Sequence, residues 1–190
     1  MTKILAFAGS ARTDSFNKKL VSIAAEGARE AGAEVTVIDL ADYPMPLFDQ
    51  DLEAGQGMPE NAQAFKTLLM EHDGLLIASP EYNSAFSPLL KNVIDWASRA
   101  TTENEAPLLA YKGKYAAIMA TSPGGLGGMR GLVFLRMLLG NIGITVLPDQ
   151  QAVPSAFQAF DGNGYLKDEK TQAKVKGLGQ ALAVELIKKK

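Results

Sequence analysis

Several kinds of chemistry are absent from this 190-residue sequence because the residues they require are absent. It contains no cysteine, which excludes disulfides, thiol catalysis and any cysteine-ligated iron–sulfur cluster. Its single histidine, His72, cannot build a histidine-rich metal site, so we expect no bound metal. No partner motif surrounds His72, and we interpret it as a surface or helix-end residue rather than a catalyst.

Neither charge nor hydropathy indicates a macromolecular or membrane target. The formal net charge is −2 and the pI is about 5.5, which gives no reason to expect nucleic acid as a partner. No apolar stretch approaches the roughly 20 residues of a membrane span, and the first residues are too polar for a signal peptide. With 47% apolar and 21% charged residues, we expect one soluble, cytoplasmic domain over residues 1–190.

Apolar segments typical of strands alternate with helical patterns along the chain. Ser87-Pro88 is a strong helix start, Gly32 a helix stop, and 41–58 is typical of a long loop. Five strand–helix alternations predict an α/β fold, with a parallel sheet covered by helices on both faces. The predicted strands lie near residues 3–8, 35–40, 74–79, 114–120 and 144–147.

The loop after the first strand is rich in hydrogen-bond donors. It leads into a helix, and the free N–H groups at a helix start carry partial positive charge. Ser10, Ser15 and Asn17 add side-chain donors, and Arg12 can bind two phosphate oxygens at once. The sequence therefore predicts a phosphate site here. The alternative is an ordinary polar turn in which Asp14 or Ser15 only caps the helix.

Two doubly wound folds fit the alternation, the dinucleotide-binding fold and the flavodoxin-like fold. The first turn favours the second, because it has only Gly9 where a dinucleotide loop needs three glycines. Asp39, at the end of the second strand, resembles the ribose-binding acid of the dinucleotide fold, which we interpret as coincidence. We expect a flavodoxin-like, three-layer α/β/α fold with five parallel strands in the order 2-1-3-4-5. A ligand would then lie at the carboxyl ends of strands one, three and four.

Those strand ends carry two further unusual loops, at 79–84 and 121–128. Tyr82 offers a flat amphipathic surface, and Asn83 offers hydrogen bonds to the edge of a heterocycle. Glycines in the second loop allow the backbone to approach a flat ligand. Each loop alone could be a rigid proline turn or a loose connection, but three such loops at adjacent strand ends favour a ligand site.

These loops resemble the NADPH-dependent FMN reductase family, most nearly its flavodoxin-like quinone, chromate and azo-dye reductases. The resemblance runs in register from about residue 3 to residue 143 and continues more weakly into residues 158–171. The motifs that show it are Gly9-Ser10-x-Arg12-x-x-Ser15-x-Asn17, Pro80-Glu81-Tyr82-Asn83 and Leu90-Lys91-Asn92-Val93-Ile94-Asp95-Trp96.

The resemblance implies an FMN site made from all three loops. The implied cofactor-binding residues are Ser10, Arg12, Ser15 and Asn17 for the phosphate, Pro80, Glu81, Tyr82 and Asn83 for the ring and ribityl chain, and Ser122, Gly124 and Gly125 for the far side of the ring, with their neighbours Phe16 and Ser84.

The resemblance also implies an NAD(P)H-dependent oxidoreductase that needs no catalytic side chain. The flavin N5 would pass hydride from NADPH or NADH to a small-molecule acceptor, such as a quinone, an azo compound, chromate or free flavin, in a ping-pong cycle. The alternative is a flavodoxin-type one-electron carrier, whose acidic docking face a net charge of −2 does not support. A hydrolase on this fold would need a Gly-x-Ser-x-Gly elbow and a base, and the sequence has neither.

Two predicted helices, 86–99 and 129–140, should lie side by side on one face of the sheet. The second is apolar nearly all round, and the first carries Leu89, Trp96 and Arg99 off its main buried stripe. We therefore predict a homodimer or homotetramer through these helices, which the family resemblance also implies. The alternative is a fully internal helix in a monomer.

Overall fold

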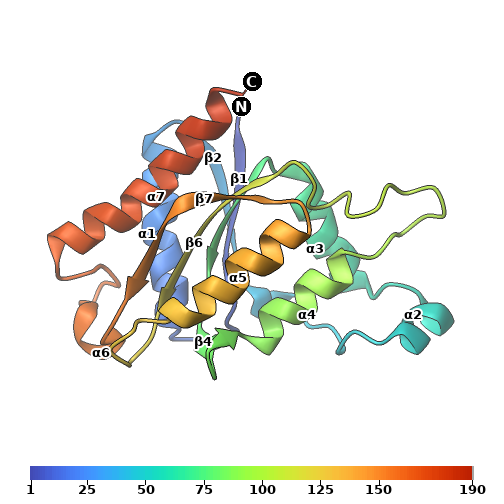
Figure 1. The fold of residues 1–190 in the computed structure, drawn as a ribbon, viewed down its shortest axis with the longest axis horizontal. Coiled ribbons are helices and arrows are strands. Elements are labelled where there is room, and N and C mark those ends of the chain that lie inside the picture. Colours follow the sequence, from blue (N-terminus) through green and yellow to red (C-terminus); the bar gives the residue numbers. More distant parts are fainter. Residues whose placement is uncertain (190) are drawn as a thin grey trace.

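A five-stranded parallel sheet lies at the centre of the computed structural model, which describes residues 1–189 (Figure 1). The strand order is β2-β1-β3-β6-β7, which is the predicted order when the hairpin strands β4 (Glu81–Tyr82) and β5 (Ala85–Phe86) are not counted. The predicted flavodoxin-like fold class is confirmed. The strands of the sheet are β1 (Lys3–Ala8), β2 (Glu34–Ile38), β3 (Gly74–Ala78), β6 (Tyr115–Thr121) and β7 (Thr145–Val153).

Helices cover both faces of this sheet (Figure 1). Alternate residues of β1 serve the two cores, with Ile4 and Ala6 packed in one and Leu5 and Phe7 in the other. The central strands are continuous apolar runs because both of their faces are buried. On one face lie α1 (Phe16–Glu30) and α7 (Glu169–Ile187), and on the other lie α3 (Glu60–Glu71), α4 (Pro88–Ala97) and α5 (Met129–Asn141).

Helices α1 and α7 approach each other closely through two glycines. A Cβ on Gly27 would lie 2.1 Å from the carbonyl oxygen of Lys176. A Cβ on Gly179 would lie 1.8 Å from the carbonyl oxygen of Ala24. Any side chain at these positions would push the helices apart, so the two glycines allow the close packing of α1 on α7.

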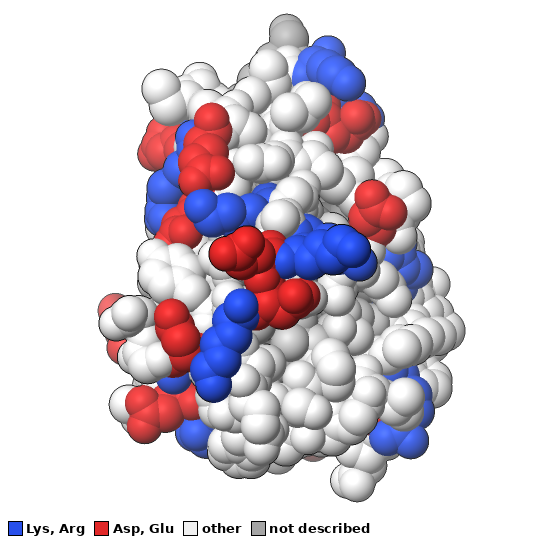
Figure 2. All heavy atoms as spheres, turned by 90° about the vertical axis from the view of Figure 1, so that its left-hand side faces the viewer, with Lys and Arg blue, Asp and Glu red and all other residues white. Residues whose placement is uncertain are grey.

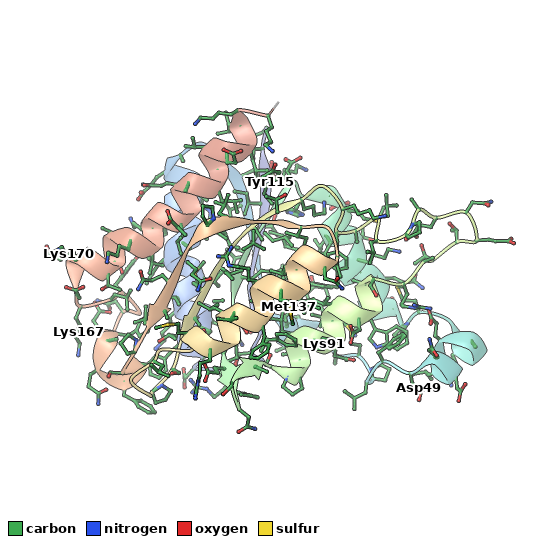
Figure 3. All side chains as sticks on the ribbon, viewed as in Figure 1. Asp49, Lys91, Tyr115, Met137, Lys167 and Lys170 are labelled. Carbon is green, nitrogen blue, oxygen red and sulfur yellow. The ribbon has the colours of Figure 1, made fainter. Side chains whose placement is uncertain are left out.

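Short elements that the sequence did not predict lie outside the sheet. One of them, α2 (Gln50–Gln56), lies in the segment 41–58 that was predicted as a loop. It buries none of its residues, so it lacks the apolar periodicity that indicates a helix in a sequence. Asp49 caps it, and it projects from the body of the molecule (Figures 1 and 3). These elements are the 3₁₀ helix η1 (Leu40–Asp42), α2 (Gln50–Gln56), the strands β4 (Glu81–Tyr82) and β5 (Ala85–Phe86) of one hairpin, and α6 (Ala156–Ala159).

The segment 41–58 packs on α4 through the backbone of Pro46. Trp96 Nε1 and Asn92 Nδ2 donate to the Pro46 carbonyl oxygen at 2.8 and 2.9 Å. The Phe48 ring lies edge-on to Trp96, with the ring centroids 5.0 Å apart. Trp96 is therefore fully buried, and the prediction that it belongs to a free outer face of this helix is wrong.

Within residues 1–189, none of the helices combines the length and apolar character needed to cross a bilayer.

Candidate functional site

A cleft of about 370 Å³ opens at the carboxyl edge of the sheet. The start of α1, the β4–β5 hairpin and α6 meet at this edge, at the bottom of Figure 1. The cleft is lined by Ser10, Arg12, Ser15, Phe16, Asn17, Pro80, Glu81, Tyr82, Thr121, Ser122, Pro123 and Phe157.

One end of the cleft is formed by the β1–α1 loop, whose donors have few internal partners. Ser15 occupies the N-cap position of α1, yet its side chain does not cap the helix. The first turn of α1 contains no acidic residue. The Arg12 guanidinium lies over the Phe16 ring at 5.7 Å and forms no ion pair within residues 1–189. Free helix N–H groups, an uncommitted hydroxyl and an unpaired guanidinium together favour an anion.

The base of this loop is fixed to α4 by Ser87. Its hydroxyl donates to the Gly9 carbonyl oxygen at 2.6 Å and accepts from the Leu90 N–H at 3.1 Å. A Cβ on Gly9 would lie 3.0 Å from Leu90 Cβ, so the loop needs glycine for this close approach. The predicted helix start at Ser87 is confirmed, and the same residue positions the loop.

The β4–β5 hairpin forms the opposite wall of the cleft. Tyr82 is 55% exposed and presents its ring there. Asn83 and Ser84 occupy the turn with φ of 52° and 71°. Positive φ at both central residues is the requirement of a type I′ hairpin turn, which suits asparagine. These two residues shape the hairpin and lie outside the cleft lining.

The carboxylate of Glu81 is held by α5. It accepts from Arg130 Nε and Nη2 at 2.9 and 2.7 Å and from the Gly131 N–H at 3.1 Å. Burial by itself raises the pKa of Glu81, but the Gly131 N–H and the Arg130 guanidinium outweigh it and hold the pKa below its ordinary value. Glu81 thus anchors the hairpin to the start of α5.

The β6–α5 loop brings Ser122 and Pro123 to the cleft. The backbone restrictions of this loop fall on Gly127 and Gly128, which have φ of +61° and +90°. A Cβ on Gly127 would lie 2.6 Å from the Val153 carbonyl carbon. Gly124 and Gly125 of the predicted site are exposed and lie beside the cleft rather than in its lining.

An aromatic cluster closes the side of the cleft toward α6. Phe157 is 68% exposed and meets Phe16 edge-on at 5.4 Å, and Phe16 stacks on Phe160 at 5.4 Å. The sequence analysis missed Phe157, Thr121 and Pro123 as lining residues. Phe157 lies on a four-residue helix that has no periodicity to detect, whereas Thr121 and Pro123 stand within a loop that was already singled out.

The sequence over residues 2–158 matches the model of a known family, described as NADPH-dependent FMN reductase. The chain belongs to the NADPH-dependent FMN reductase family. This result confirms the predicted family and enzyme class, and FMN with NADPH or NADH as the cofactors of the family.

Individual relatives agree with this family. The chain is 35% identical over 181 residues to the NADPH:quinone oxidoreductase of Arabidopsis thaliana, covering 93% of this chain and 87% of the relative. It is 34% identical over 181 residues to an NAD(P)H-dependent FMN reductase of Pseudomonas aeruginosa, covering 95% and 92%. Among solved structures, the flavoenzyme NAD(P)H:(acceptor) oxidoreductase FerB of Paracoccus denitrificans matches with a TM-score of 0.81 and 29% identity, over 99% of this chain and 98% of that chain.

For this FMN reductase family member, the structure brings most of the predicted site residues to one cleft. Their roles toward FMN stay predictions. Those that line the cleft are Ser10, Arg12, Ser15, Phe16, Asn17, Pro80, Glu81, Tyr82 and Ser122, and those beside it are Asn83, Ser84, Gly124 and Gly125.

Two polar residues that the sequence analysis set aside have internal roles in this FMN reductase family member. Asp39 forms an ion pair with Lys18 and caps η1 by accepting from the Ala41 N–H at 2.9 Å. His72 is 5% exposed at the end of α3, and its ring nitrogens lie 2.6 Å from the Leu68 carbonyl oxygen and 2.9 Å from Thr36 Oγ1. Of the two alternatives given for His72, the helix-end residue is confirmed and the surface residue is wrong.

Proposed function

We propose that the cleft binds FMN and that the protein is an NAD(P)H-dependent quinone or FMN reductase. The observation that supports this most directly is the open start of α1, where the Ser15 hydroxyl and the Arg12 guanidinium are left without polar partners in residues 1–189. A phosphate group fits this donor set. Hydrogen bonds to a charged group contribute about 1.5–3 kcal/mol each, so a few of them retain the cofactor firmly.

The residues of the chain bind and orient, and none has to exchange a proton. FMN, when bound, would supply the redox chemistry by carrying hydride at N5 from NADPH or NADH to a quinone, azo compound, chromate or free flavin in a ping-pong cycle. Ser10, Arg12 and Ser15 would hold the phosphate. Tyr82 and Pro123, both exposed, present surfaces against which a flat ring can lie.

The decisive experiment removes the guanidinium. In Arg12→Ala we expect the Kd for FMN to rise about 100-fold, because a charged, bidentate hydrogen-bonded contact with the phosphate is lost. Turnover of the FMN-saturated variant with NAD(P)H and a soluble quinone should change less than about threefold, because Arg12 does not take part in the redox step. Fluorescence titration of FMN and NAD(P)H absorbance measure the two quantities.

Arg29→Ala is the matched control, since Arg29 lies in the last turn of the same helix and donates to the Val35 carbonyl oxygen. It should leave FMN affinity unchanged. Full FMN affinity in Arg12→Ala would show that the phosphate assignment is wrong.

A flavodoxin-type electron carrier is the rival function. The face made by α1 and α7 does not favour it, because acidic and basic side chains are interspersed there (Figure 2). Lys176, for example, pairs with Glu30 at 2.7 Å and lies 3.6 Å from Glu26. Sustained NAD(P)H oxidation with a soluble quinone supports the reductase, and its absence in the FMN-loaded protein supports the carrier.

We propose in addition that the protein assembles through the outer surface of α4 and α5, as a homodimer or homotetramer. Val133 and Met137 are 61% and 65% exposed on α5, and Lys91 lies on the neighbouring α4 (Figure 3). Between these helices lies an apolar groove of about 440 Å³. It is lined by Ala85, Phe86, Lys91, Phe134, Met137, Leu138 and Asn141.

Light scattering of the purified protein tests this surface. We expect a dimer or tetramer for the natural chain and a smaller species for Met137→Asp, because a buried unpaired charge opposes association. Ile187→Asp, a change at an exposed apolar residue of α7, is the control and should leave the mass unchanged. A monomeric natural chain contradicts the proposal.

A further inference from the structure

The side-chain amide of Asn17 is already committed inside the protein. Its Nδ2 donates to the Thr121 carbonyl oxygen at 3.0 Å, and its Oδ1 accepts from the Thr121 N–H at 3.0 Å. Both bonds are buried, Asn17 is 5% exposed, and the partners are 104 residues apart in the sequence. The Asn17 amide therefore bonds to both the N–H and the carbonyl oxygen of Thr121, which is the pairing that a residue of a neighbouring strand makes in a sheet.

Thr121 connects the start of α1, at one side of the cleft, with the Ser122–Pro123 segment at the other. It is the last residue of β6 and directly precedes Ser122 and Pro123. Its hydroxyl donates to the Val153 carbonyl oxygen at 2.8 Å, and the Ser122 N–H donates to the same oxygen at 3.3 Å. The Ser122 carbonyl oxygen in turn accepts from the Ala156 N–H at 3.1 Å. Asn17 thus ties the start of α1 to a continuous backbone network that reaches β7 and α6.

We propose that Asn17 is a positioning residue, which sets the spacing between the β1–α1 loop and the Ser122–Pro123 wall of the cleft, rather than a ligand of the phosphate. The proposal rests on the FMN function proposed above. Asparagine is suited to this role because its short amide offers a donor and an acceptor together. Serine and alanine cannot bridge both groups of Thr121, and aspartate would place a charge against a carbonyl oxygen.

Comparison of FMN with riboflavin, which lacks the phosphate, separates the two roles. Loss of a phosphate ligand weakens FMN binding alone, whereas loss of a positioning residue weakens the binding of both flavins. In Asn17→Ala we expect the Kd values for FMN and riboflavin to rise together, each about tenfold. Arg12→Ala is the reference, in which the Kd for FMN should rise at least about tenfold more than that for riboflavin.

The absorption spectrum of bound FMN gives an independent readout. The spectrum should shift in Asn17→Ala, because the Ser122–Pro123 wall of the cleft moves. It should stay unchanged in Arg12→Ala saturated with FMN. A residue that affects stability alone would leave both the spectrum and the affinities of the folded protein unchanged. A rise in the Kd for FMN with no change for riboflavin would overturn the proposal.

Asn17→Ser and the natural chain provide tests that do not depend on the alanine variant. The serine hydroxyl can still donate to a phosphate but cannot bridge Thr121, so this variant should bind both flavins as Asn17→Ala does. FMN affinity restored by serine contradicts the proposal. In the natural chain without ligand, the Thr121 amide should exchange slowly with solvent by NMR, and rapid exchange that FMN alone suppresses would also contradict it.

The binding experiments distinguish failure of the proposed FMN function from failure of the positioning role of Asn17. If the natural chain binds neither FMN nor riboflavin, the FMN site is refuted. If the natural chain binds both but the alanine and serine variants lose only FMN, the FMN site stands and the positioning role of Asn17 is refuted.

Discussion

The helices α1, α4 and α5 begin at the carboxyl edge of the sheet, and their first turns are completed in different ways. At α4 the cap is local, because the hydroxyl of Ser87 accepts from the Leu90 N–H at 3.1 Å. At α5 the cap comes from the hairpin, because the Glu81 carboxylate accepts from the Gly131 N–H at 3.1 Å. At α1 no side chain caps the helix, although Ser15 stands in the capping position.

The difference separates the scaffold of the cleft from its binding end. A helix start without a cap lacks about 1 kcal/mol of stabilisation unless water or a ligand satisfies its N–H groups. The two capped starts hold the walls of the cleft in place, while the open start faces into it. Two serines that look alike in sequence, Ser15 and Ser87, therefore have opposite roles.

The largest effect should come from Ser87. In Ser87→Ala the helix cap is lost and the buried Gly9 carbonyl oxygen loses its donor, so we expect about 3 kcal/mol less stability in urea unfolding. Ser22→Ala is the control, since the Ser22 hydroxyl only donates to the Lys18 carbonyl oxygen on the exposed side of α1. A loss below about 1 kcal/mol would mean that Ser87 is not a principal support of the loop.

The cap of α5 should contribute less, because the Arg130 side chain is 59% exposed. We expect Glu81→Gln to cost about 1.5 kcal/mol of stability, since the charge-assisted bonds to Arg130 and Gly131 become neutral ones. Glu103→Gln, at an exposed position, is the control and should change stability by less than about 0.5 kcal/mol. Equal stability of the Glu81 and Glu103 variants would show that the hairpin does not depend on this anchor.

The same carboxylate predicts a pH dependence. The pKa of Glu81 in the folded protein lies below its ordinary value of 4.5, so its stabilising effect is complete above that value and is lost as the pH falls. The stability difference between the natural chain and Glu81→Gln should therefore be constant above about pH 5 and shrink as the pH falls below it. Urea unfolding at a series of pH values measures it, and a difference that grows on acidification has the wrong sign for this account.

Local patterns were sufficient to predict the sheet and its order. The central strands β1, β3 and β6 are buried on both faces and the helices α1 and α4 have apolar stripes, so these elements are visible in the sequence. That the first loop lines the cleft could also be predicted, because Ser10, Arg12 and Ser15 follow directly after the end of a strand. The exposed helix α2 has no such signal, since it buries none of its residues.

Roles that depend on distant partners could not be predicted. Asn17 and Glu81 were both expected to contact FMN, which stays a prediction. The bonds of Asn17 to Thr121, 104 residues away, and of Glu81 to Arg130 and Gly131, 49 and 50 residues away, were not expected. Nothing local distinguishes a donor that faces a cleft from one that joins two loops. The burial of Trp96 under Phe48 has the same origin, because its cover comes from a segment earlier in the chain.

The smallest change in stability, and the sharpest test of the comparison, is expected at Ser15. Because its hydroxyl caps nothing, Ser15→Ala should change stability without ligand by less than about 0.5 kcal/mol, far less than Ser87→Ala. Its Kd for FMN should nevertheless rise about tenfold, because one hydrogen bond to the phosphate is lost. Urea unfolding and flavin titration of the same preparations give both numbers. If Ser15→Ala instead loses stability and keeps its FMN affinity, the start of α1 is an ordinary capped helix and the phosphate belongs elsewhere.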